Sequence, residues 1–311
     1  MDPDITRTAE TLADHALVLL AIGVALVAFV LVGIVAAVRL ARRYQARLGR
    51  VVAWLFVQVH RIPRVGPRLR ATRVVVPPRY VFLHLGLGLV ATAGVVAFVV
   101  IAEEALTGRA VAQFDYAFAA ALHDSASPRW REVFRIVTWF GSDEVLGVLS
   151  AIIAVALLIQ RELVLAIGWI IAQAGGGFLN VTLKRAFERS RPELPDAVHA
   201  SGWGFPSGHA MGTFIFCGVG AYLALRFIRS TNMRVIVVVA ASSACLVIGF
   251  TRLYLGAHYL SDVAAALFAA AAWVAVCISG MELGLRRGSR VEGRGARKAR
   301  RFQPSTLDPR P

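Results

Sequence analysis

Long apolar runs with almost no charge constrain the fold of this chain more than any other feature. A helix needs about 20 such residues to cross the hydrocarbon of a bilayer. Two of the seven runs, 145–160 and 235–250, are slightly short, and we expect them to draw on flanking residues or local thinning of the bilayer. The other five are 16–38, 80–101, 163–183, 207–227 and 260–281. The sequence therefore predicts an all-α, multi-pass bundle of seven transmembrane helices.

The composition excludes two other classes of protein. With 57% hydrophobic residues, the chain has too much apolar surface to be disordered. Three cysteines in 311 residues are too few for a disulfide-stapled secreted module. All three lie inside apolar runs without metal-ligand spacing, so we interpret them as small buried side chains.

The net charge of +15 raises the question of nucleic-acid binding, but the placement of the charges favours a membrane topology. Residues 39–79 hold eleven Arg and no acidic residue, and the tail after 285 and the link 226–234 are also basic. The N-terminus and the 102–144 loop are acidic. Because positive loops stay in the cytoplasm, we expect a cell-membrane protein with a cytoplasmic C-terminus and no nucleic-acid partner.

The expected organisation has three parts. Residues 1–79 form an N-terminal span and a basic cytoplasmic segment, in which 51–62 could lie on the membrane surface. Residues 80–285 form the membrane core. Residues 286–311 form a basic tail rich in Gly, Arg and Pro, which we expect to be disordered. The first run follows an acidic flank, which is unlike a cleavable signal peptide.

Three polar clusters lie at span ends on the predicted outer side, within 184–192, 205–209 and 251–262. Ionisable residues there are costly and indicate function. Arg191 precedes Pro192 and offers a fork of donors that matches phosphate. Ser207 and Gly208 open a helix whose free N–H groups can bind an anion. Together with Lys184 and Arg252, these residues could converge on one dianion.

His258 and Asp262 are four residues apart and share a helical face. The carboxylate can hold the imidazole in one tautomer, which leaves Nε2 free to attack. His209 could act as general acid for a leaving alkoxide. Ordinary interfacial histidines, snorkelling arginines or metal ligands are the alternatives. We expect no metal, because no third close ligand follows from the sequence and the nearby cations would repel one.

The pattern Lys–six residues–Arg-Pro, Pro-Ser-Gly-His, and Arg–five residues–His–three residues–Asp resembles the type 2 phosphatidic acid phosphatase family. The resemblance covers about 80–283 and implies a six-helix core that acts on lipid phosphates without metal or cofactor. It implies His258 as nucleophile, His209 as proton donor and Asp262 as the partner of His258. Phosphate would be bound by Lys184, Arg191, Ser207, Gly208 and Arg252. The family usually has Ser before the third-motif Arg, and this chain has Thr251, which keeps the hydroxyl.

The expected function is hydrolysis of a lipid phosphate or polyprenyl pyrophosphate at the outer membrane face through a phosphohistidine. Undecaprenyl pyrophosphate, phosphatidylglycerol phosphate and phosphatidate are all candidate substrates. One alternative is a transferase that moves the phosphoryl or head group to another hydroxyl. Another is a lipid-binding protein without catalysis. The oligomeric state and the role of 1–79 stay open.

Overall fold

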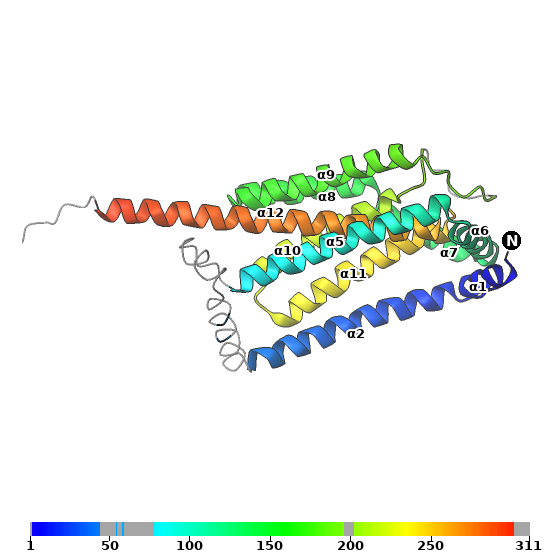
Figure 1. Ribbon diagram of the computed structural model, residues 1–311, viewed down its shortest axis with the longest axis horizontal. Helices are drawn as coiled ribbons and strands as arrows, with labels where there is room; N and C mark the ends of the chain where they lie inside the picture. The colour runs from blue at the N-terminus through cyan, green and yellow to red at the C-terminus, as the bar shows by residue number, and fades with distance from the viewer. Residues whose placement is uncertain (1, 44–53, 55–57, 59–77, 196–201, 302–311) are drawn as a thin grey trace, which may run out of the picture.

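The computed structural model describes residues 2–43, 54, 58, 78–195 and 202–301, of which 30–43, 78–79 and 288–301 are described by their backbone alone. The described residues form helices and connecting turns (Figure 1). The first four helices are α1 (Pro3–Asp14), α2 (Ala16–Arg43), α5 (Pro78–Thr107) and α6 (Arg109–Ser125). The remaining helices are α7 (Pro128–Trp139), α8 (Asp143–Ile159), α9 (Leu163–Phe187), α10 (Gly208–Phe227), α11 (Thr231–Tyr254) and α12 (Leu260–Arg301).

Six helical segments of the described residues are long and apolar enough to cross a membrane, and the count is seven if α1 and α2, which meet at a 72° bend, are one span. This confirms the multi-pass helical bundle. The short run at 235–250 lies in α11, which gains flanking residues at both ends. The short run at 145–160 lies in α8, where α7 adds length to the apolar segment Pro128–Ile159.

Small residues allow the helices of the core to approach closely. A Cβ on Gly94 of α5 would lie 2.8 Å from the carbonyl oxygen of Phe268 of α12. In the same way, Gly175 of α9 receives the ring of Trp273, which donates from Nε1 to the carbonyl of Ala172 at 2.9 Å. Close contact at glycine and alanine is typical of membrane bundles, because lipid tails provide no hydrophobic drive for helices to associate.

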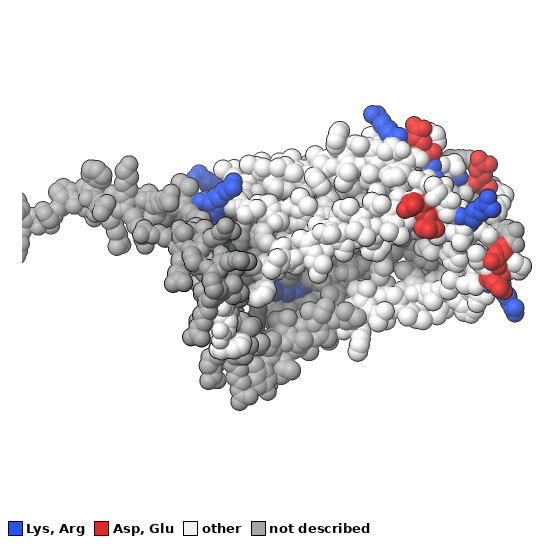
Figure 2. All heavy atoms as spheres, viewed as in Figure 1, with Lys and Arg blue, Asp and Glu red and all other residues white. Residues whose placement is uncertain are grey.

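One end of the bundle carries α1, α6 and α7, which lie across the ends of the long helices (Figure 1). The acidic side chains visible in Figure 2 gather at this same end. The carboxyl ends of α9 and α11 and the amino ends of α10 and α12 also lie here, so the three polar clusters meet at one end. The basic link between α10 and α11 lies at the opposite end.

The helices at the two ends of the described chain pack on the core or extend it. α1 packs on α6, and α2 packs on α11. α12 continues as helix to Arg301, into the tail from residue 286 for which the sequence predicts disorder. The segment 51–62, for which a surface helix and a solvated topology signal are the alternatives, lies almost entirely outside the described residues.

Candidate active site

Two connections bring the polar clusters together. α9 ends at Phe187, and its C-cap residue Glu188 adopts the left-handed conformation. The backbone N–H of Ser207 donates to the carbonyl of Asp262 at 3.1 Å, which ties the start of α10 to the first turn of α12. Between α11 and α12, Gly256 has φ of +66°, a conformation that glycine adopts without steric cost. This turn places His258 directly before α12.

His258 is held from both sides of its ring. Nδ1 lies 3.4 Å from Oδ2 of Asp262, and Nε2 lies 3.0 Å from Nη1 of Arg191. A guanidinium can only donate, so Nε2 is the acceptor and the ring proton is on Nδ1, facing the carboxylate. The side chain is 3% exposed, and burial lowers the pKa of His258 to about 4 despite the opposing effect of Asp262. The imidazole is therefore neutral at physiological pH with its basic lone pair on Nε2.

Arg191 and Lys184 line the approach to this imidazole. Arg191 also donates from Nη1 to the carbonyl of Ala257 at 3.0 Å and from Nε to that of Gly202 at 2.9 Å. Nζ of Lys184 donates to the carbonyl of Trp203 at 2.6 Å. Burial lowers the pKa of Arg191, and Asp262 partly offsets this. An arginine guanidinium stays protonated in proteins. Both cations are within electrostatic range of one another.

Arg252 is buried in the last turn of α11. The side chain is 3% exposed, and its Nη1 donates to Oγ1 of Thr138 at 2.9 Å. Its Nε is buried and has no hydrogen-bond partner among the described residues. The hydroxyl of neighbouring Thr251 donates to the carbonyl of Ile248 at 2.6 Å, so it is satisfied within its own helix.

The start of α10 supplies the remaining predicted residues. Ser207 is fully buried, and its Oγ has no partner within the described part of the chain. A Cβ on Gly208 would lie 3.9 Å from Cε of Lys184, so the first turn of α10 borders the lysine. His209 follows in that turn and is within electrostatic range of His258 and Arg252. The structure thus places every predicted site residue at one end of the bundle.

Two residues of this region were not predicted as site residues. Arg189 forms ion pairs with Asp262 at 2.6 Å and with Asp115 of α6 at 2.8 Å. Arg189 lies inside the first polar cluster, but nothing in its spacing sets it apart from the other arginines there. Asp115 lies in the 102–144 segment, for which the sequence predicts an acidic loop, and in the structure it belongs to α6. The only feature of the sequence that could have pointed to it is a carboxylate among apolar and small residues.

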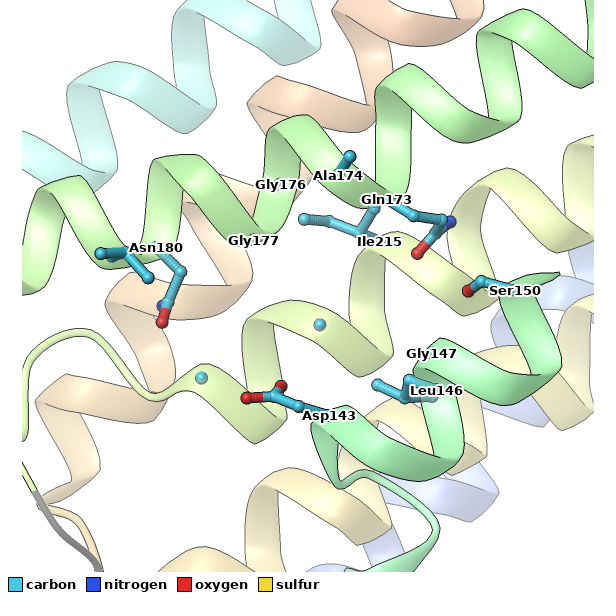
Figure 3. A pocket seen from close by; sticks show the side chains of 13 residues that line it. Asp143, Leu146, Gly147, Ser150, Gln173, Ala174, Gly176, Gly177, Asn180 and Ile215 are labelled. Carbon is cyan, nitrogen blue, oxygen red and sulfur yellow. The ribbon is translucent and has the colours of Figure 1, made fainter.

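A groove with a volume of about 400 Å³ lies between α8, α9 and α10, next to residues predicted to bind phosphate. Figure 3 shows Asp143 and Asn180 pointing into one end of this groove and Gln173 and Ser150 at the other. Its walls also include Gly147, Gly177, Gly208 and Gly212. Gly208 is a wall residue of the groove and also the first residue of α10, so the groove is continuous with the start of α10.

No group of three or more His, Cys, Asp and Glu side chains that could hold a metal ion occurs in the part of the chain that the structure describes. The expectation of a metal-independent reaction remains a prediction.

Comparison with known proteins identifies the family. Residues 162–283 match the model of the PAP2 superfamily. The chain is 30% identical over 168 residues to phosphatidylglycerophosphatase B of Bacillus subtilis (strain 168), which covers 53% of this chain and 82% of that protein. The chain belongs to the PAP2 superfamily.

Two further similarities agree with this assignment. The PAP2 chain is 37% identical over 102 residues to lipid A 1-phosphatase of Rhizobium etli, over 29% of this chain and 39% of that protein. Its fold matches the crystal structure of a transmembrane PAP2-type phosphatidylglycerolphosphate phosphatase from Bacillus subtilis with a TM-score of 0.56 and 25% identity. That match covers 62% of this chain and 96% of the other. The protein is therefore a multi-pass membrane hydrolase of the lipid phosphatase class, as the sequence predicts.

Proposed function

We propose that this protein removes the terminal phosphate of a membrane lipid at the outer face of the cell membrane, with His258 as nucleophile. The arrangement around His258 is the observation that carries this proposal. A buried neutral imidazole has its Nδ1 proton directed to Asp262, while its Nε2 faces Arg191. A nucleophile, its orienting carboxylate and a phosphate-binding cation are thus in contact.

The reaction has two steps. Nε2 of His258 attacks the terminal phosphorus, and the bond from phosphorus to the leaving oxygen breaks while His209 donates a proton to that oxygen. His209, now neutral, takes a proton from water, whose oxygen attacks the phosphohistidine and releases inorganic phosphate and free His258. Lys184, Arg191 and Arg252 stabilise the charge on the equatorial oxygens, which is most of what phosphoryl transfer requires.

Two buried donors support a phosphate site. Ser207 Oγ and Arg252 Nε have no hydrogen-bond partner among the described residues. Buried polar groups are nearly always hydrogen-bonded, so donors of this kind are expected where a ligand supplies the acceptors. The free N–H groups at the start of α10 add to the attraction for an anion.

The groove between α8, α9 and α10 suits the lipid tail. It starts at Gly208, next to the phosphate-binding cluster, and continues along the long axis of the helices towards Gln173. Asn180 and Gln173 are seven residues apart on α9, which corresponds to a depth of about 10 Å. A lipid could therefore enter from the side, with its phosphate at the bundle end and its chain in the groove.

Phosphatidylglycerol phosphate is the first substrate to test, because phosphatidylglycerophosphatase B is the more extensively matched of the two curated relatives. Phosphate release by the purified protein is measured with this lipid, phosphatidate and undecaprenyl pyrophosphate, in excess EDTA. Release that persists in EDTA and is abolished in His258→Ala supports the proposal. Near-normal turnover of His258→Ala, or activity that EDTA removes, overturns the mechanism. Transfer to added alcohols in preference to water favours a transferase.

A further inference from the structure

A second buried charge cluster lies behind His258, on the side away from the phosphate-binding cations. Its members are Asp115 of α6, Arg189 of the loop after α9, and Ser261 and Asp262 of α12. Asp115 is 1% exposed. Its Oδ1 accepts from the backbone N–H of Ser261 at 3.1 Å, and its Oδ2 accepts from Nη2 of Arg189 at 2.8 Å and from the Ser261 hydroxyl.

Arg189 joins the two carboxylates of this cluster. Its Nη1 donates to Oδ1 of Asp262 at 2.6 Å and to Oγ of Ser261 at 2.7 Å, while Nη2 is held by Asp115. The guanidinium also lies over the ring of Tyr259, 4.6 Å from its centroid. Because the fork of an arginine is planar and rigid, these contacts fix its orientation.

The two oxygens of Asp262 consequently have different partners. Oδ1 is occupied by Arg189, and Oδ2 accepts from the backbone N–H of Tyr259 at 2.9 Å and faces Nδ1 of His258 at 3.4 Å. Rotation of the carboxylate would break the contact with Arg189. The guanidinium and the N–H of Tyr259 therefore fix the plane of the carboxylate, so that one of its oxygens faces the imidazole.

We infer that Arg189, held in place by Asp115, is a positioning residue that sets the orientation and the charge of Asp262 against His258. Asp115 also pairs with Arg189 and so neutralises part of its positive charge. The carboxylate of Asp262 therefore keeps more of its negative charge for the interaction with the imidazole. A buried ion pair is by itself weak evidence for a role in stability. Here the same carboxylate, Asp262, contacts both Arg189 and His258, so the ion pair acts on the imidazole as well as on stability.

The inference rests on the proposed role of His258 as nucleophile and predicts opposite effects of two substitutions. The charged and titratable groups that act on His258 are Asp262 at Nδ1, Arg191 at Nε2, and Arg252 and His209 within electrostatic range. In Arg189→Gln, the charge of Asp262 is no longer balanced, the imidazolium becomes more stable, and the acid limb of the pH–kcat/KM profile moves up. In Asp115→Asn, Arg189 has only Asp262 as anionic partner, and the acid limb moves down.

The test uses the full-length protein in detergent with dioctanoyl phosphatidate as substrate, so that the ionisation of the substrate is common to all variants. We expect kcat to fall by about 10- to 100-fold in both variants with little change in KM, by analogy with the loss of the hydrogen-bond partners that orient metal-bound histidines. We expect the acid limb to move by about 0.5 to 1 pH unit, in the opposite directions given above. Matched controls are Asp124→Asn on the same helix α6 and Arg185→Lys, both at exposed positions.

Thermal unfolding in detergent identifies any variant that does not fold, and if Arg189→Gln fails, the downward shift in Asp115→Asn carries the test. Unchanged kcat and an unmoved acid limb in folded variants overturn the inference. So does a loss of activity that only follows a loss of folded protein. The wild-type protein and His258→Ala are assayed in parallel. If wild type is active and His258→Ala is inert, a negative result concerns Arg189 and Asp115 alone, whereas an active His258→Ala protein refutes the proposed function itself.

Discussion

Nη1 of Arg191 lies 3.0 Å from Nε2 of His258. A phosphorus atom bonded to Nε2 would carry its equatorial oxygens into the space next to this guanidinium. The same contact sets the tautomer of the imidazole, because a guanidinium has no lone pair to accept a proton. In the proposed mechanism, Arg191 therefore acts both on the phosphate and on the imidazole of His258.

Arg191→Gln should lower kcat/KM by about 10²- to 10³-fold, as for the loss of one donor to a developing oxyanion. Arg191→Lys should recover only part of this, because a lysine keeps the charge but lacks the planar fork. Steady-state phosphate release measures both, with Arg185→Gln at an exposed position of α9 as control. Equal activity of Arg191→Lys and wild type would argue against a bidentate contact with phosphate.

The acid limit of activity should lie well below the ordinary pKa of histidine. Burial lowers the pKa of His258 from 6.5 to about 4, and only the neutral form has a lone pair on Nε2. Activity should therefore be retained as the pH falls through 6.5 and be lost as it falls through about 4. The pH dependence of kcat/KM measures this limit.

Arg191→Gln identifies the group responsible for that limit. The charge of Arg191 lowers the pKa of His258, so its removal should move the limit to higher pH. A limit near pH 6.5 in the wild type, unchanged in Arg191→Gln, would assign it to a different group.

Gly177→Leu should discriminate between lipids of different chain length. A Cβ at Gly177 meets no heavy atom within 4 Å and projects from the wall of the groove, so the bundle can accept a side chain there. The leucine would fill part of the groove. The ratio of kcat/KM for dioleoyl to dioctanoyl phosphatidate should fall by about 10-fold, the low end of the range for one methylene in a hydrophobic pocket.

Gly86→Leu is the matched control for the groove, because its Cβ also meets no atom within 4 Å and Gly86 does not line this pocket. An unchanged ratio in Gly177→Leu, or the same fall in Gly86→Leu, would exclude this groove as the site of the lipid chain.

The orientation in the membrane can be tested with single cysteines. In a protein whose three native cysteines are replaced by alanine, Ser190→Cys lies at the site end and Ser230→Cys in the basic link at the opposite end, both at exposed positions. Because basic links stay inside, a membrane-impermeant maleimide should label Ser190→Cys in intact cells and Ser230→Cys only after lysis. The reverse pattern would place the site in the cytoplasm.

Much of this protein follows from local patterns in its sequence. Helices in a bilayer need about 20 apolar residues, so the spans can be predicted from length and hydropathy alone. The short run at 235–250 required only its flanking residues to become the 24-residue helix α11. The pairing of His258 with Asp262 follows in the same way, because four residues along a helix bring two side chains together.

Contacts between distant parts of the chain required the tertiary structure. Asp115 and Arg189 are 74 residues apart, and no spacing rule connects them. Their contact depends on α6 lying across the bundle end beside the loop after α9. The groove beside Gly208 likewise depends on how α8, α9 and α10 pack, and the helical part of the tail depends on α12 continuing beyond the core. The sequence alone determined which residues are available for the chemistry, because their spacing within single segments is local. Only the packing of the helices decided which carboxylate and which cation meet at His258, and which cavity lies beside the start of α10.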